Sequence, residues 1–492
     1  MSVVAVAINK EAKYPRKEYN FRPDKAYPEY FFGNDISPEQ NKVYELVRDS
    51  LRMMSLDSCN YGSPSWNPLG DGYIRPGDYV LIKPNMVIEK NHGDGGTECL
   101  YTQPSVVAAI IDYVCIALSN TGRIVVADAP LQTCDFGKLI HESGYFDLIK
   151  YYQNKGIDIE LHDLRELTSV KKGNVIRASI REDLENAGSI VKLNELSFHS
   201  LLSNDQIKSE RITSYNPDEL AKHHSCHKHE YLIAKDLLDA NCVINVSKPK
   251  THRKAGATIS LKNFVGINSR KEYLPHHRIG GTELGGDEYL GRSVLRSFGG
   301  HLLDLINRSS SRKHYVIANI LQFFHKSVCS IDSKLFSDKS SYYEGSWYGN
   351  DTIWRTILDL NLIVKYADIN GIMTKREQRK VFCLGDMVVM GEKEGPLLPS
   401  PRNVGIISAG GNCVCFDEAI STLMGLDSTM IPSIHNARTL KGDYCLVGKD
   451  DEATIVSNNK KWNGCTIRDL CLEDTIRLVP SEGWKNHIEL KL

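Results

Sequence analysis

The stretches Tyr79-Val80-Leu81-Ile82-Lys83-Pro84-Asn85 and Arg123-Ile124-Val125-Val126-Ala127-Asp128-Ala129-Pro130 decide the expected fold. Each is a short apolar run that ends in polar groups, which is typical of a strand buried in a parallel sheet. Between them, residues 104–119 have helical apolar spacing and a Gln-Pro-Ser start suited to a helix N-terminus. Strand, helix and strand in this order predict right-handed crossovers and a mostly parallel sheet.

The same alternation continues along the chain. We expect strands at residues 157–162, 242–246 and 403–408, and helices at residues 38–54, 136–153, 234–240, 351–366 and 417–424. Two polar stretches, 273–291 and 330–346, are predicted to be loops. The expected fold is therefore α/β: a mostly parallel open sheet with flanking helices, plus an irregular or β-rich insertion.

Changes in this pattern divide the chain into segments. A length of 492 residues favours two or three lobes over one core. We expect a capping N-terminal segment (1–75), a first α/β segment (76–164), an insertion or subdomain (165–232), a second α/β segment with the site loops (233–440) and a C-terminal closing segment (441–492).

Charge and composition narrow the class of function. The 60 basic and 61 acidic side chains give a formal net charge of -1, whereas a general nucleic-acid binder needs a basic surplus. No apolar run reaches the roughly 18–20 residues that span a bilayer, and the start lacks the basic region of a secretory signal. We therefore expect a cytoplasmic protein that binds no nucleic acid and has no transmembrane segment. Its oligomeric state stays open.

The predicted strand ends carry the polar residues from which we predict a site. In an open parallel sheet, ligands bind beyond the carboxyl ends of the strands. The residues that follow the predicted strands are Lys83, Asn85, Asp128, Lys248, Lys250, Thr251, His252, Gly411 and Asn412. We therefore expect a binding pocket at this edge of the sheet.

The strongest segment is Lys248-Pro249-Lys250-Thr251-His252, followed by Thr258, Lys262 and Asn263. Thr258 and Lys262 are four residues apart, so a helix there would put both on one face. Several ammonium groups near one strand end would hold a carboxylate or a phosphate, and burial would make a lysine a base or a nucleophile. We expect His252, Lys250 and Lys262 to be catalytic and the other residues to bind the substrate. A solvated basic loop is equally compatible with these residue types.

Three further segments are candidates for substrate contact. The turn at residues 410–412 opens a predicted helix, where backbone amides favour an anion. His276 lies in a glycine-rich loop of a kind that often closes over ligands. Trp347 is suited to stacking on a ring, Asn350 to capping a helix or binding substrate, and Arg355 to holding a charged group.

Other conspicuous residues have a structural interpretation. The segment 223–229 holds four histidines and a cysteine without a zinc-site spacing, so we expect a surface loop. The 13 cysteines include no CxxC, and we interpret Cys413 and Cys415 as packed thiols. Asp417 is interpreted as complementing the dipole of its own helix.

Several stretches together resemble domain-of-unknown-function family 362. They are residues 80–85, 125–130, 243–252, 261–266, 395–396, 416–419 and 423–425. The resemblance implies an α/β fold with a pocket around Lys83, Asn85, Lys250, His252, Lys262 and Asn263. Some relatives carry a ferredoxin-like module with iron–sulfur clusters, but this chain has no CxxCxxC run and we expect no cluster. The segment 345–352 resembles a subgroup associated with cell-surface polysaccharide gene clusters.

Three functions follow as hypotheses. The leading one is an enzyme that acts on an anionic small molecule, such as a sugar, phosphate or carboxylate derivative, in cell-surface polysaccharide metabolism. The second is a divalent-metal enzyme that uses His252, His276 and a carboxylate such as Asp128 or Asp287. The third is a non-catalytic binding or scaffold protein. The cofactor stays unknown, and a Rossmann dinucleotide enzyme is disfavoured because no strand is followed by GxGxxG.

Overall fold

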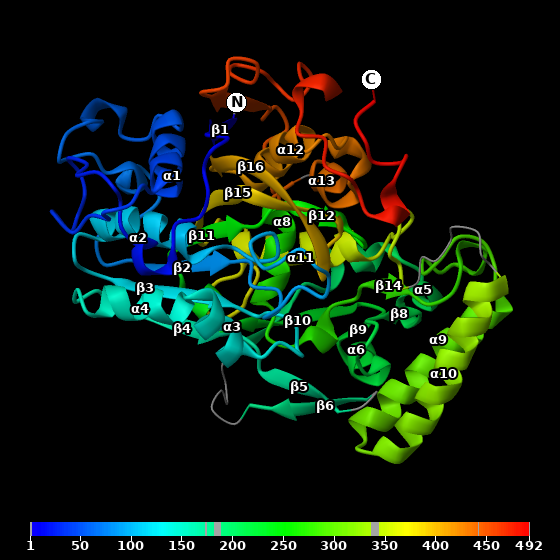
Figure 1. Ribbon diagram of the computed structural model, residues 1–492. Helices are drawn as coiled ribbons and strands as arrows, with labels where there is room; N and C mark the ends of the chain where they lie inside the picture. The colour runs from blue at the N-terminus through cyan, green and yellow to red at the C-terminus, as the bar shows by residue number, and fades with distance from the viewer. Residues whose placement is uncertain (1, 173–174, 182–187, 336–343, 441, 492) are drawn as a thin grey trace.

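The computed structural model describes residues 2–172, 175–181, 188–335, 344–440 and 442–491, and it has the α/β fold expected from the sequence (Figure 1). Its centre is a ten-stranded sheet whose main path runs β17-β1-β16-β15-β11-β2-β3-β4. Strands β12 and β13 extend this sheet beside β15. No helix among the described residues is both long and apolar enough to cross a membrane.

One half of the sheet is parallel. Strands β2 (Tyr79–Pro84), β3 (Arg123–Asp128), β4 (Ile159–Asp163), β11 (Cys242–Ser247) and β15 (Lys380–Glu394) all run in the same direction. Their carboxyl ends therefore meet at one edge, with Lys83, Asp128 and Ser247 at the ends of three neighbouring strands.

The other half reverses direction. Strand β16 (Leu398–Gly410) forms a long antiparallel hairpin with β15, and β1 (Ser2–Ile8) pairs antiparallel with β16. Strand β17 (Ala453–Ser457) completes the sheet parallel to β1. The N-terminal and C-terminal segments, which we expected to cap and close the core, thus each contribute a strand to it.

Helices cover both faces of the sheet because strand side chains alternate between them. Val80 and Ile82 belong to a core with α1 (Lys42–Met53), α2 (Pro104–Leu118) and α4 (Tyr145–Gln153). Leu81 belongs to a core on the opposite face with α7 (Lys235–Asp239) and α11 (Ile353–Tyr366). A neighbouring core adds α12 (Cys413–Leu423) and α13 (Pro432–Ala437).

The helix predicted at residues 136–153 is divided into two. Helix α3 (Phe136–Ser143) ends at Gly144, and α4 begins directly after it. Gly144 has φ of +94°, a conformation that residues with a side chain rarely adopt. The apolar spacing predicted one continuous helix over this range and did not reveal the turn at Gly144.

The expected insertion contains small antiparallel sheets. Strands β5 (Leu167–Lys172) and β6 (Val175–Ile180) pair with each other, and β10 (Lys228–Ala234) lies between β7 (Gly188–Lys192) and β9 (His224–Ser225). Strand β8 (Glu210–Arg211) pairs with β14 (His277–Arg278), which attaches the predicted loop at 273–291 to the insertion.

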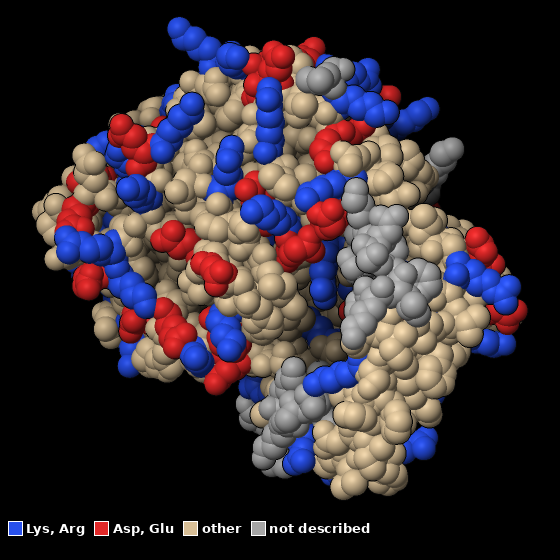
Figure 2. Space-filling model, turned by 45° about the vertical axis from the view of Figure 1, so that its right-hand side comes forward, with Lys and Arg blue, Asp and Glu red and all other residues tan. Residues whose placement is uncertain are grey.

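A helical hairpin that the sequence did not reveal projects from the body. It consists of α9 (Val294–Ser311) and α10 (Tyr315–Leu335) and forms the projection at the lower right of Figure 2, where few charged side chains lie. Its exposed apolar side chains are Val294, Phe298, Leu305, Val316, Ile317, Ile320, Phe323, Phe324 and Ile331. Of the loop predicted at 330–346, residues 336–343 lie outside the described residues, and α10 continues to Leu335.

Candidate functional site

A cavity of about 200 Å³ lies beyond the carboxyl ends of β2, β3 and β11. The predicted site residues that line it are Asn85, Asp128, Lys250, His252, Thr258, Lys262, Asn263 and His276. One wall is apolar and includes Pro130, Ile212 and Leu397. The cavity therefore offers charged, polar and apolar contacts to a small ligand.

A short β-hairpin carries three of the polar groups. Strand β12 (Lys250–His252) pairs antiparallel with β13 (Gly256–Thr258), and Lys250 lies opposite Thr258. Lys250 donates a hydrogen bond from Nζ to Asn85 Oδ1 at 2.7 Å. The hydroxyl of Thr258 is buried without a hydrogen-bond partner among the described residues, so it is available to a ligand.

Helix α8 (Ser260–Asn263) supplies Lys262 and Asn263. Its first two amides, from Ser260 and Leu261, donate to the carboxylate of Asp417 at 2.8 and 3.0 Å. Asp417 thus caps α8, whereas we had interpreted it as complementing the dipole of its own helix, α12. Thr258 precedes this short helix in a strand, so the predicted helical pairing of Thr258 and Lys262 does not occur.

A buried ion pair forms the floor of the cavity. Lys83 Nζ lies 2.7 Å from Asp128 Oδ1, and Asp128 Oδ2 accepts a hydrogen bond from the Met86 amide. Gly266 packs against this pair so closely that a Cβ there would lie 2.0 Å from Asp128 Oδ1. The charge of Asp128 is therefore already compensated, and Lys83 lies behind it.

Four lysines surround the cavity: Lys250, Lys254, Lys262 and Lys271. Burial lowers the pKa of Lys250 and Lys271 to about 7. Burial also lowers the pKa of Lys254 and Lys262 to about 8. An anion between these groups would favour their charged forms, because opposite charges attract strongly where water is excluded.

Among the described residues, two histidines have Nε2 free for a ligand, one with a hydrogen atom and the other with a lone pair. His252 Nδ1 accepts hydrogen bonds from the amides of Lys254 and Ala255 at 3.0 and 3.2 Å, so in the neutral ring the proton is on Nε2. His276 Nδ1 donates to the carbonyl of Leu274 at 2.5 Å, which leaves a lone pair on Nε2. Burial lowers the pKa of both rings, that of His276 to about 3. One ring can donate a hydrogen bond and the other can accept a proton.

Comparison with models of known protein families shows to which family the chain belongs. The model of a family described as domain of unknown function (DUF362) matches residues 80–204 and 205–422. The chain belongs to this family. A search of curated proteins finds no match.

Two predicted residues of the segment 248–252 lie outside the cavity. Lys248 Nζ lies 3.1 Å from Asp386 Oδ2 and donates to the Tyr14 hydroxyl at 2.6 Å, so its charge is compensated internally. Thr251 donates its hydroxyl hydrogen to the carbonyl of Lys393 at 2.9 Å. Both side chains therefore anchor the segment that carries Lys250 to the rest of the protein.

Gly411 and Asn412 lie at the opposite edge of the DUF362 sheet. Strand β16 runs antiparallel to β15, so its carboxyl end meets the amino ends of β2 and β11. A second cavity, of about 440 Å³, lies there. We had expected Gly411 and Asn412 to lie at the same edge as Lys83, Asp128 and Lys250. That expectation was wrong because β16 runs in the opposite direction to the parallel strands.

The predicted aromatic and arginine contacts also have internal partners. Trp347 donates from Nε1 to the carbonyl of Asp287, and Arg355 donates to the carbonyl of Phe198 and pairs with Asp351. Asn350 Nδ2 donates to the His276 carbonyl at 2.9 Å. Asn350 therefore supports the loop that holds His276 rather than lining the cavity.

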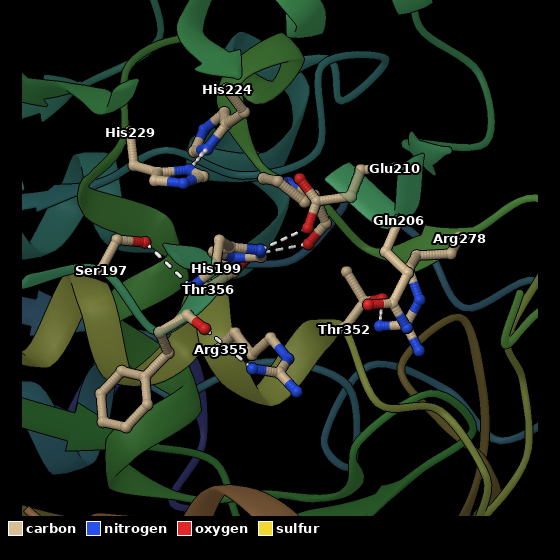
Figure 3. Close-up of polar contacts among 12 residues, drawn as sticks. Ser197, His199, Gln206, Glu210, His224, His229, Arg278, Thr352, Arg355 and Thr356 are labelled. Carbon is tan, nitrogen blue, oxygen red and sulfur yellow. Dashed lines mark hydrogen bonds and ion pairs between the residues drawn. The ribbon is translucent and has the colours of Figure 1, made fainter. Parts of the chain in front are cut away.

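The histidine-rich segment is not a simple surface loop. His224 and His229 are buried, and their Nδ1 atoms lie 3.2 Å apart (Figure 3). They lie next to His199, whose Nδ1 is 2.5 Å from Glu210 Oε1. The prediction was wrong for these two residues because β9 and β10 turn them inward, whereas His227 is exposed.

Of the residues proposed for a metal, Asp128, His252 and His276 line the same cavity, whereas Asp287 does not. Asp287 accepts hydrogen bonds from the amides of Arg278 and Asp351 and from the Thr352 hydroxyl. Across the described residues, no group of three or more histidine, cysteine, aspartate or glutamate side chains could hold a metal ion.

Sequence reasoning missed Arg253, Lys254 and Lys271. Arg253 and Lys254 lie in the turn that joins β12 to β13, so the two-residue period of an extended chain does not single them out. Their closeness in the sequence to Lys250 and His252 is the signal that could have identified them. Lys271 lies in the short 3-10 helix Lys271–Tyr273, which has no periodic signal, and only the tertiary fold brings it to the cavity.

Proposed function

We propose that this DUF362 protein is an enzyme that binds an anionic small molecule in the cavity and acts on it by proton transfer. The observation that carries the proposal is an excess of buried ammonium groups. Among the described residues, four lysines line the cavity, whereas its one carboxylate, Asp128, is already paired with Lys83. Lys254 has a second carboxylate nearby, that of Glu344 at 4.0 Å, and the other three lysines form no ion pair in the described part of the chain. Buried cations without counter-ions are costly, and a bound carboxylate or phosphate would offset that cost.

The two histidines supply the proposed chemistry. His276 Nε2 accepts a proton from the substrate, and bound negative charge raises its pKa toward the useful range. His252 donates a hydrogen bond from Nε2 to an oxygen on which negative charge develops. Lys250 and Lys262 stabilise the same charge, and Thr258 and Asn85 orient the ligand.

The substrate is proposed to be a sugar, phosphate or carboxylate derivative. Tyr215 lines both this cavity and a cleft of about 740 Å³, and the part of a ligand beyond its anionic group is proposed to extend toward that cleft. A cytoplasmic location and a role in cell-surface polysaccharide metabolism are part of the proposal and rest on the sequence alone.

Titration calorimetry with sulfate, phosphate and sugar phosphates tests the binding step. We expect Lys262→Met to weaken binding by about tenfold or more, because a charge-assisted hydrogen bond contributes roughly 1.5–3 kcal/mol. Lys235→Met, which removes an exposed lysine, is the matched control and should bind as wild type does. Unchanged affinity in both Lys262→Met and Lys254→Met would refute an anion site here.

A further inference from the structure

Two cysteine thiols meet at the edge of the sheet opposite the lysine-lined cavity. Cys383 on β15 and Cys413 at the start of α12 have their Sγ atoms 3.4 Å apart. Cys413 lines the cavity of about 440 Å³ and is partly exposed, whereas Cys383 is fully buried. Cys413 therefore pairs with a distant residue rather than with Cys415, its neighbour in the CxC sequence.

The surroundings make the two thiols unequal. The Cys413 thiol lies in the first turn of a helix, and its hydrogen bond with Cys383 lowers its pKa. Burial raises the pKa of the Cys383 thiol well above its usual value. An accessible thiol that ionises readily next to a buried partner is the arrangement that thiol–disulfide exchange requires.

We propose that Cys413 and Cys383 form a thiol–disulfide exchange site for small disulfides that enter the cavity beside α12. The Cys413 thiolate attacks one sulfur of the disulfide, forms a mixed disulfide and releases one thiol. Cys383 then loses its proton and attacks Cys413 Sγ, which forms the Cys383–Cys413 disulfide and releases the second thiol. The protein dithiol is oxidised by two electrons, and the small disulfide is reduced to two thiols.

This site contacts the helix that carries Lys262. Cys383 Sγ lies 3.0 Å from the Ser260 hydroxyl, and Ser260 begins α8. Asn245 also donates to the Ser260 hydroxyl and carbonyl. The Ser260 hydroxyl contacts both thiols, and forming the disulfide draws the two sulfurs together and removes their hydrogen atoms, so oxidation should alter the position of α8 and of Lys262.

Peptide mapping after treatment with bis(2-hydroxyethyl) disulfide tests the exchange site. This probe is neutral and therefore does not compete for the lysine-lined cavity. In wild type we expect a Cys383–Cys413 cross-link, seen as the loss of two hydrogen atoms. Cys383→Ala should instead retain one 2-hydroxyethylthio group on Cys413 as a mixed disulfide, and Cys413→Ser should lose both products. Cys415→Ser, on the same helix, is the matched control and should cross-link as wild type does.

Two further measurements make the result decisive. Thermal melting of each variant shows that it is folded, and simple adducts on the exposed Cys59, Cys226 and Cys471 show that the reagent is active. A Cys413 that stays reduced while these three react would overturn the proposal. An adduct on Cys413 of wild type that never resolves to a cross-link would also overturn it.

The link to α8 has its own readout, which rests on the proposed anion site. We expect oxidation to change sulfate affinity by about fivefold or more, the lower range of coupling between two sites, and reduction to reverse the change. Cys413→Ser should show no such response. A cross-linked protein with unchanged sulfate affinity would overturn the link, whereas absent sulfate binding in the reduced protein would instead count against the anion site.

Discussion

The four lysines around the DUF362 cavity make its charge depend on pH near neutrality. The pKa of Lys250 and Lys271 is about 7, against roughly 10.4 for an unfolded lysine. Between these values the unfolded chain binds more protons than the folded one. These groups therefore make the free energy of unfolding rise as the pH increases from about 7 to about 10.

Anion affinity should follow the opposite trend. As the pH rises from about 6 to about 9, the lysines lose protons, and sulfate affinity should fall by about tenfold or more. Sulfate is the suitable probe because its own charge does not change in this range. Binding near pH 8 should take up protons, which calorimetry in buffers of different ionisation enthalpy measures. Sulfate affinity that does not vary with pH would contradict neutral lysines in the cavity.

At the residue scale, the sequence predicted which polar side chains line the cavity better than it predicted their hydrogen-bond and ion-pair partners. Lys250 and Lys248 are two residues apart and identical in type, yet one lines the cavity and the other pairs with Asp386. Asp386 lies far along the chain, so no local pattern could reveal the difference. The tautomer of His252 likewise depends on two backbone amides that only the folded turn brings to its ring.

At the element scale, α8 depends on a carboxylate from another helix. Asp417→Ala should leave the amides of Ser260 and Leu261 buried without partners, at a cost on the order of 2–4 kcal/mol in unfolding free energy. Sulfate affinity should fall as well, because α8 carries Lys262. Asp417→Asn keeps one acceptor oxygen and should lose less. Urea unfolding measures the cost, and an alanine variant as stable as wild type would argue against this cap.

The apolar face of the α9–α10 hairpin should affect solubility and not stability. Phe323 and Phe324 are 70% and 55% exposed. Replacing both by serine should change the unfolding free energy by about 0.5 kcal/mol or less and raise the ammonium sulfate concentration needed for precipitation. Leu302→Ser, on the buried face of α9, is the control and should be clearly destabilising. Equal destabilisation by both changes would show that the outer face is packed.

Strand direction was the main element-scale limit of sequence analysis. The apolar run at 403–408 predicted a strand correctly, but such a run carries no direction. Because β16 runs antiparallel to β15, Gly411 and Asn412 lie at the far edge of the sheet and not at the expected site. The prediction of parallel pairing was correct for β2, β3 and β11. Each of these strands is joined to the next through helical segments, which parallel pairing requires.

At the scale of the whole molecule, the C-terminal segment is part of the main sheet. A chain that ends at Glu452 would lack β17 and expose the edge of β1, and it would lose Trp484, whose Nε1 donates to the Arg253 carbonyl beside the cavity. We expect aggregation or a much lower melting temperature. A chain that ends at Leu490 keeps these contacts and should melt as wild type does. Equal melting of both would contradict an integral role for this segment.

The place of β1 in the sheet has a consequence for protein synthesis. Val4 pairs with Gly410 on one side and with Ile455 on the other, so β1 is translated long before either neighbour exists. At 5–20 residues per second, its apolar side chains wait on the order of tens of seconds for partners. During this time the apolar side chains of β1 must be kept from aggregating while the chain is still attached to the ribosome. Slower elongation or scarce chaperones should therefore lower the yield of folded protein without any change in its final stability.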